Sequence, residues 1–222
     1  MTINLMVYKT MIFDCDGVIL NSNKIKTEAF YETTKVFGHD YAQTLVDYHL
    51  KNGGISRYAK FEYFFHKILN QQVDEFTLNT LLLQFAETVK QRLATCEVAE
   101  GLADLKYQNK DAKWLIVSGG DQTELREVFA TKNLAQFFDG GIFGSPDTKE
   151  CILQAQLNEN GIILPALFLG DSKYDYQVAT KANFDFIFLT EWTEVKDWQE
   201  WVLKNNIKYK KNISEMLVTQ TR

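Results

Sequence analysis

The feature of this chain that most restricts its fold is a series of short apolar segments separated by stretches of helical periodicity. The apolar segments lack the polar alternation of a sheet with one solvated face, so we expect strands buried on both faces of a parallel sheet. Helical patterns at Gln122–Lys132, Thr148–Asn160 and Tyr174–Ala182 separate the later strands. This alternation predicts an α/β fold with a doubly wound parallel sheet. The five predicted strands are Met6–Phe13, Trp114–Ser118, Gly140–Gly144, Leu164–Gly170 and Phe184–Thr190.

The interval between the first two predicted strands has a different pattern. Three segments, "KIKTEAFYETTKVFG", "RYAKFEYFFHKILN" and "EFTLNTLLLQFAETVKQRLA", place apolar residues at helical spacing, and no strand pattern interrupts them. We therefore predict a core domain of residues 1–20 and 96–222, with a helical domain of residues 21–95 inserted after the first strand. The aromatic residues of "FEYFFHKI" are interpreted as packing inside this helical bundle, and His66 as structural.

Composition excludes several classes of function. The formal net charge is −5 and no basic block dominates, so we expect no nucleic-acid and no membrane partner; the lysines of "KYKKN" near the end are interpreted as solvated surface. The three cysteines are far apart with no CxxC pair, which argues against a disulfide framework and fits a reducing cytosol. No apolar stretch approaches the roughly 20 residues of a membrane span. We predict a cytoplasmic protein that is a monomer or a weak dimer.

Polar residues follow the predicted strands. Asp14 and Asp16, in "DCDGVILNS", come directly after the first strand. In an open α/β sheet, ligands bind beyond the carboxyl ends of the strands, so residues at these positions are expected to share one edge of the sheet. The other polar residues at this edge are Ser118, Lys149, Asp171 and Asp175.

Together these motifs resemble those of the haloacid dehalogenase superfamily, in its phosphatase and phosphomutase branch. "DCDGVILNS" is similar to the family signature DxDGxxxxS, and Ser118, Lys149 and "GDSKYD" are similar to the second, third and fourth motifs. The helical insertion is similar to the small helical cap that one subfamily carries at this point. The resemblance covers nearly the whole chain and implies a Rossmann-like core with an inserted cap domain.

The resemblance implies phosphoryl transfer through Asp14, which would attack phosphorus to form an aspartyl phosphate. Asp16 would act as general acid toward the leaving alcohol and as general base toward water. It also implies a Mg²⁺ cofactor held by the carboxylates of Asp14 and Asp171 and by the backbone carbonyl of Asp16.

The remaining motif residues are implied to bind phosphate. Ser118, Gly119 and Lys149 would hold phosphate oxygens and stabilise the charge of transfer. Asp175 would orient Lys149 or a metal-bound water.

The segment "LKNGGISRYAKF" resembles the substrate-specificity loop of sugar-phosphate mutases and their phosphatase relatives. Gly53 and Gly54 would let the backbone approach a ligand, and Arg57 would grip a phosphate or carboxylate. The alternative interpretation is a turn between helices, followed by Ser56 as an N-cap and a surface Arg57.

The motifs also favour one reaction over others. An intact Asp16 favours phosphate-ester chemistry over carbon–halogen or phosphonate cleavage, and it argues against a Schiff base at Lys51 or Lys60. Lys26 stands where the related mutases carry a histidine, and Gly170 where they carry a further acid, which weakens a mutase assignment. We therefore predict a magnesium-dependent phosphatase for a small phosphorylated metabolite, with sugar and sugar-acid phosphates as candidates. The alternatives are a phosphomutase and a catalytically idle relative that binds phosphorylated metabolites.

Overall fold

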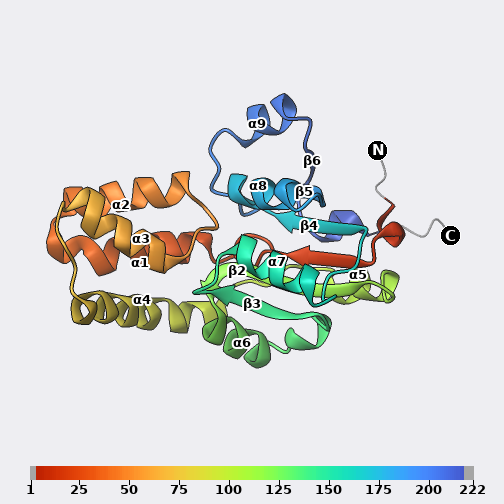
Figure 1. Ribbon diagram of the computed structural model, residues 1–222, viewed down its shortest axis with the longest axis horizontal. Coiled ribbons are helices and arrows are strands. Elements are labelled where there is room, and N and C mark those ends of the chain that lie inside the picture. The colour runs from red at the N-terminus through yellow and green to blue at the C-terminus, as the bar shows by residue number, and fades with distance from the viewer. Residues whose placement is uncertain (1–3, 218–222) are drawn as a thin grey trace.

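A six-stranded parallel sheet forms the centre of the protein in the computed structural model, which describes residues 4–217 (Figure 1). The strands lie in the order β3-β2-β1-β4-β5-β6, and every neighbouring pair is parallel. The predicted α/β fold with a parallel sheet is therefore confirmed, although the two ends of the predicted core range lie outside the described residues. The strands are β1 (Thr10–Phe13), β2 (Lys113–Asp121), β3 (Gly141–Ser145), β4 (Ala166–Gly170), β5 (Asp185–Leu189) and β6 (Lys208–Lys210).

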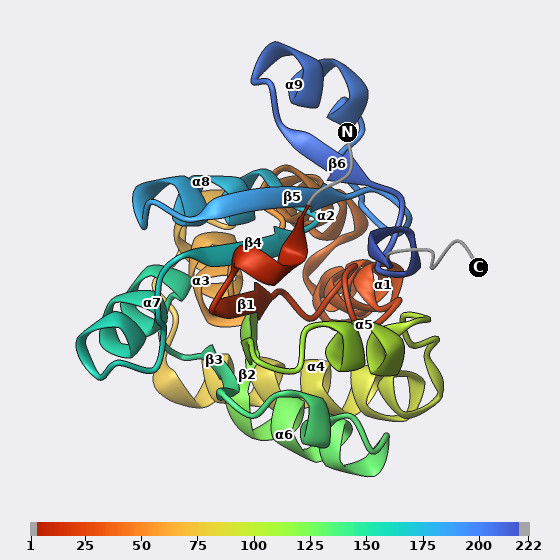
Figure 2. The ribbon, with the colours of Figure 1, turned by 90° about the vertical axis from the view of Figure 1, so that its right-hand side faces the viewer.

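Helices pack on both faces of this sheet (Figure 2). In β1, Met11 and Phe13 point into one hydrophobic cluster and Ile12 points into the other. Because both faces of the central strands are buried, their sequences are apolar without alternation. One cluster includes α5 (Leu102–Gln108) and α6 (Gln122–Thr131), and the other includes α7 (Lys149–Asn158), α8 (Lys173–Lys181) and α9 (Trp198–Lys204).

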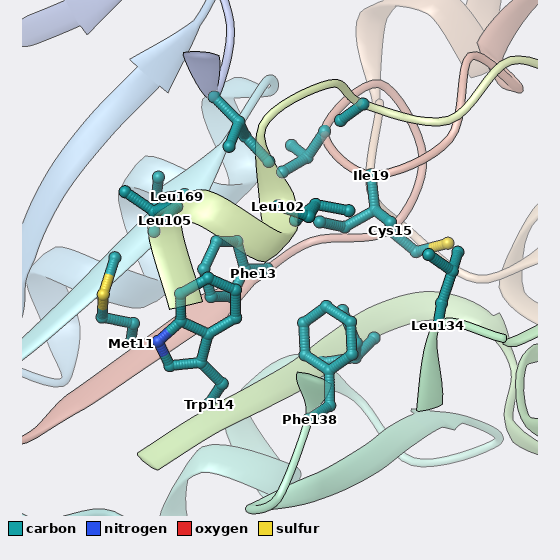
Figure 3. Packing of buried hydrophobic residues seen from close by; sticks show 14 of the residues in the cluster. Met11, Phe13, Cys15, Ile19, Leu102, Leu105, Trp114, Leu134, Phe138 and Leu169 are labelled. Carbon is teal, nitrogen blue, oxygen red and sulfur yellow. The ribbon is translucent and has the colours of Figure 1, made fainter. Parts of the chain in front are cut away.

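Aromatic packing fixes the end of β1 (Figure 3). The ring of Phe13 lies 4.7 Å from that of Trp114 in β2 and 5.7 Å from that of Phe138, measured between centroids. Tilted and edge-to-face aromatic pairs of this kind add to the gain from burial. Phe13 is the residue directly before Asp14, so this packing sets the position at which the chain leaves the sheet.

A separate bundle of helices follows β1 and lies beyond the carboxyl ends of the strands (Figure 1). Its own hydrophobic cluster contains Phe30, Phe61, Phe64 and Phe85, so the aromatic residues of "FEYFFHKI" pack within the bundle as predicted, while His66 is exposed. We call this bundle the cap. It consists of α1 (Asn23–Thr34), α2 (His39–Lys51), α3 (Arg57–Tyr63), a π-helical turn (Phe64–Ile68) and α4 (Glu75–Thr95).

Some elements differ from the prediction. The first strand is shorter than expected, because Leu5–Val7 forms a 3₁₀ turn and pairing begins at Thr10. Helices α2, α5 and α9 were not predicted. Strand β6 lies within "KYKKN" and is largely exposed, and lysines are common on such edge strands because they discourage pairing with another chain. Across residues 4–217, no helix combines the length and hydrophobicity required for a membrane span.

Candidate active site

The turn after β1 brings two distant acidic segments together. The Asp14 N–H donates to the Leu169 carbonyl (2.9 Å), which continues the pairing with β4 and places Asp14 beside the segment that carries Asp171. Gly17 has a φ of +75°, and a Cβ on it would lie 2.1 Å from Asp171 Oδ2. Only glycine therefore allows the backbone of this turn to lie against the Asp171 carboxylate.

Lys149 links two of the buried carboxylates. Its Nζ lies 2.9 Å from Asp14 Oδ2 and 2.5 Å from Asp175 Oδ1. Burial alone would lower the pKa of Lys149, but the two carboxylates raise it above its ordinary value, so the side chain is a cation. The other oxygen of Asp175 accepts from the Ser172 N–H (3.2 Å) and hydroxyl (2.6 Å) at the start of α8. Asp175 thus holds Lys149 against Asp14.

The acidic residues outnumber their positive partner. Carboxylate oxygens of Asp14, Asp171 and Asp175 lie within 4.8 Å of one another, and Lys149 is the one cation that pairs with any of them among residues 4–217. Burial raises the pKa of Asp14 to about 7 despite Lys149. Burial, followed by the charges of Asp14 and Asp175, raises the pKa of Asp171 well above its usual value.

A divalent cation fits this imbalance. When ionised, the three carboxylates carry two more negative charges than Lys149 offsets, and hard carboxylate oxygens are the ligands that Mg²⁺ prefers. Both oxygens of Asp175 already accept hydrogen bonds, whereas Asp171 has one such contact, from Asn23 Nδ2 at 2.7 Å. Asp171 is therefore a better candidate for a carboxylate ligand than Asp175. Both oxygens of Asp14 also have contacts, from the Cys15 N–H (2.7 Å) and from Lys149 Nζ (2.9 Å), so its role as a ligand stays a prediction from the sequence.

The side chain of Asp16 points to different partners. Its Oδ2 lies 2.5 Å from Lys26 Nζ, and its Oδ1 accepts from the Ser22 hydroxyl at 2.5 Å. Burial would raise the pKa of Asp16, but the charge and hydrogen bond of Lys26, with the Ser22 hydroxyl, hold it below its usual value. The sequence identified Lys26 as a departure from the mutase pattern but not as the partner of Asp16.

The predicted phosphate-binding residues of β2 lie under the cap. Ser118 is fully buried, and its Oγ accepts from the Gly120 N–H at 3.0 Å. A Cβ on Gly119 would lie 2.2 Å from the carbonyl oxygen of Gly54, so the cap loop rests directly on this part of β2. A Cβ on Gly54 would lie 3.6 Å from Lys149 Nζ, so the same loop also covers that lysine.

A cavity of about 60 Å³ lies between the cap and the carboxyl ends of the strands. Ser118 and Lys149 are not on its wall, because the loop that contains Gly53 and Gly54 lies in front of them. The residues that line the cavity from the core include Asp14, Asp16 and Asp171, and those from the cap include His49, Arg57 and Lys60.

Arg57 is buried rather than on the surface, so the alternative interpretation of a surface arginine is wrong. Its Nη2 lies 2.6 Å from Glu124 Oε1 in α6, which joins the cap to the core, while Nη1 is buried without a hydrogen-bond partner in the described structure. Ser56 does act as the N-cap of α3 and accepts from the Ala59 N–H at 3.4 Å.

The chain is similar to known proteins in both sequence and fold. A family model described as haloacid dehalogenase-like hydrolase matches residues 11–189. No curated protein matches the chain.

Solved structures share the fold at low sequence identity. A predicted phosphatase from Clostridium acetobutylicum is 20% identical with a TM-score of 0.71, covering 94% of this chain and 95% of its own. β-Phosphoglucomutase from Clostridium difficile is 15% identical with a TM-score of 0.71, covering 95% of this chain and 93% of its own. CbbY from Rhodobacter sphaeroides, solved in complex with phosphate, is 17% identical with a TM-score of 0.62, covering 84% and 88%.

Proposed function

The chain belongs to the haloacid dehalogenase-like hydrolase family, and we propose that it is a magnesium-dependent phosphatase acting on the phosphomonoester of a small metabolite. One observation carries the proposal. Asp14 is a buried carboxylate on the wall of a cavity, it is in contact with the buried cation Lys149, and it lies beside the acidic residue Asp171. A nucleophile, a positive charge for an anionic substrate and an oxygen-rich metal site are the groups that phosphoryl transfer requires.

In the first step, an Asp14 oxygen attacks phosphorus and the bond from phosphorus to the ester oxygen breaks. Asp16, which can take up a proton once its side chain has turned from Lys26 toward the cavity, donates this proton to the departing alcohol. Lys149, held by Asp175, binds the phosphoryl oxygens together with the Ser118 hydroxyl and the Gly119 N–H, once the cap loop has moved aside. When bound by Asp14, Asp171 and the Asp16 carbonyl, Mg²⁺ would offset the negative charge shared by the nucleophile and the phosphate.

In the second step, Asp16 accepts a proton from water, whose oxygen attacks phosphorus and releases phosphate from Asp14. Lys26 keeps Asp16 deprotonated in the structure, and the Asp16 carboxylate becomes a stronger base once it leaves this lysine. The Asp16 side chain must turn from Lys26 toward the cavity to reach the substrate oxygen.

Phosphate release from a panel of phosphate esters tests the proposal. Wild-type protein is expected to release phosphate only with Mg²⁺, and Asp14→Asn is expected to reduce turnover by roughly 10⁴-fold or more, because the amide cannot form the covalent intermediate. Full turnover by Asp14→Asn would contradict the mechanism.

A phosphomutase is the second candidate. Two buried cations of the cap, Arg57 and Lys60, favour it because a mutase has to hold a second phosphate. Formation of an isomeric sugar phosphate without free phosphate would decide for the mutase.

A further inference from the structure

Helix α3 of the cap directs two buried cations to the cavity that Asp14 also lines. Arg57 and Lys60 are three residues apart, which places them on the same side of the helix, and both line the cavity. Lys60 is 2% exposed. Burying an ammonium group is costly unless it is paired, so a lysine at this position requires an explanation.

Lys60 has fewer polar partners than a buried lysine usually has. Among residues 4–217 its Nζ pairs with no carboxylate, and its one hydrogen bond goes to His49 Nδ1 at 2.7 Å. An ammonium group has three N–H donors, so two donors remain for another ligand. Burial, followed by the charge of Lys26, lowers the pKa of Lys60 to about 7, which reflects this shortage of negative partners.

A chain of hydrogen bonds fixes the direction of the Lys60 contact. Because the ammonium only donates, His49 Nδ1 accepts and Nε2 carries the proton that faces Thr27 Oγ1 at 3.0 Å. The Thr27 hydroxyl then donates to Glu194 Oε2 at 2.9 Å. This chain of hydrogen bonds runs from the cap to the segment after β5 and keeps His49 as a neutral acceptor. It therefore orients Lys60 without cancelling the charge of the ammonium group.

The other cation on this wall is also incompletely paired. Arg57 gives Nη2 to Glu124, while its buried Nη1 has no partner in the described structure. The cap wall of the cavity therefore combines unfilled positive donors with the apolar rings of Phe30 and Phe85. An anion on the substrate would fill these donors, whereas a neutral hydroxyl would leave the positive charge uncompensated.

We propose that Lys60 is a specificity-determining residue, which binds a second anionic group, a carboxylate or a second phosphate, on the substrate whose phosphate ester reacts at Asp14. This inference rests on the proposed function and narrows its substrate class to esters with two anionic groups. His49, Thr27 and Glu194 position Lys60.

Matched substrates test the proposal. We would compare 3-phosphoglycerate with glycerol 1-phosphate, which replaces the carboxylate by a hydroxymethyl group, and glucose 1,6-bisphosphate with glucose 6-phosphate. For wild-type protein and for Lys60→Gln, kcat/KM is measured with each compound in the presence of Mg²⁺. The first pair tests whether the enzyme recognises a carboxylate on the substrate. The second pair tests whether it recognises a second phosphate. Lys67→Gln, which alters an exposed lysine of the π-helical turn, is the matched control.

Lys60→Gln is expected to lower kcat/KM for the doubly anionic member of one pair by roughly 10- to 100-fold, the loss of a charge-assisted hydrogen bond, with a much smaller effect on its neutral partner. The ratio of the kcat/KM values of the two compounds in a pair does not depend on the fraction of folded protein. An equal loss for both members, or no loss, would overturn the proposal.

Binding to Asp14→Asn separates this inference from the proposed function. Calorimetric titration of the four compounds does not need turnover, so it reports the Lys60 contact even if the protein is no phosphatase. If Asp14→Asn binds a doubly anionic compound more tightly than its neutral partner, and the double variant Asp14→Asn with Lys60→Gln does not, the result supports a contact between Lys60 and the second anionic group. The same affinity for charged and neutral partners would contradict it.

Discussion

Asp14 and Asp16 are neighbours in the sequence, but their carboxylates contact different lysines, Lys149 and Lys26. The acidic residues were recognisable from the sequence because they follow apolar strands in a known motif. The cap lysines that line the cavity were harder to predict. Lys26 and Lys60 look like ordinary helical surface lysines, and only packing of the cap against the core brings them to the cavity.

Replacing Lys149 by methionine tests the charge balance of the site. Removing one partner of a buried ion pair is expected to cost about 3–5 kcal/mol of stability, because Asp14 and Asp175 are left facing each other without a cation. Mg²⁺ is then expected to raise the melting temperature of Lys149→Met more than that of the wild type, since ligand binding stabilises the folded state by mass action.

Differential scanning calorimetry with and without Mg²⁺ measures both effects. Lys173→Met is the control, because the Lys173–Asp197 pair is largely exposed and such pairs contribute about 0–1 kcal/mol. A melting temperature that does not respond to Mg²⁺ in either Lys149→Met or the wild type would contradict the proposed metal site.

At the level of elements, the strands of the central sheet and the long helices that follow them were predictable, because buried parallel strands have continuous apolar sequences. The short elements were missed for physical reasons. Helices α5 and α9 have seven residues each, too few to show a clear period, and β6 is a three-residue edge strand with exposed side chains. Helix α2 does carry an apolar pattern at Ala42, Leu45 and Val46, so its helical period is present in the sequence.

The contact between the cap loop and the end of β2 gives a prediction about closure. In Gly119→Ala the new Cβ would lie 2.2 Å from the Gly54 carbonyl oxygen, a backbone atom that cannot move without displacing the loop. We therefore expect kcat/KM for phosphate esters to fall at least roughly 10-fold, since misplacement of substrate-holding groups by about 1 Å costs up to 10²-fold.

Gly120→Ala is the neighbouring control. Its Cβ would lie 3.3 Å from Leu125 Cδ2 and from Lys26 Nζ, so these side-chain ends have to shift by only a few tenths of an ångström and no backbone atom is displaced. Steady-state kinetics with one substrate compares the two variants. A loss in Gly120→Ala as large as that in Gly119→Ala would count against a specific role for the loop contact.

At the scale of the whole molecule, the cap and the core have separate hydrophobic clusters and meet around the cavity. The Arg57–Glu124 ion pair and the chain from Lys60 to Glu194 cross this boundary. The cavity of about 60 Å³ is small, and the cap loop covers Lys149, so a substrate can reach the reacting groups only if the cap moves. The sequence predicted an inserted helical domain but not how closely this domain packs against the core, because that depends on contacts between residues far apart in the chain.

The central claim is that Asp14 carries the phosphoryl group, and chemical trapping tests it most directly. Protein mixed with Mg²⁺ and a turned-over ester is quenched in acid and reduced with borohydride, which converts a phosphorylated aspartate into homoserine. Mass spectrometry of the peptide that contains residues 10–24 then locates the change. The account predicts homoserine at position 14, dependent on substrate and absent from Asp14→Asn. Turnover with an unmodified Asp14, or with the modification at another residue, would contradict it.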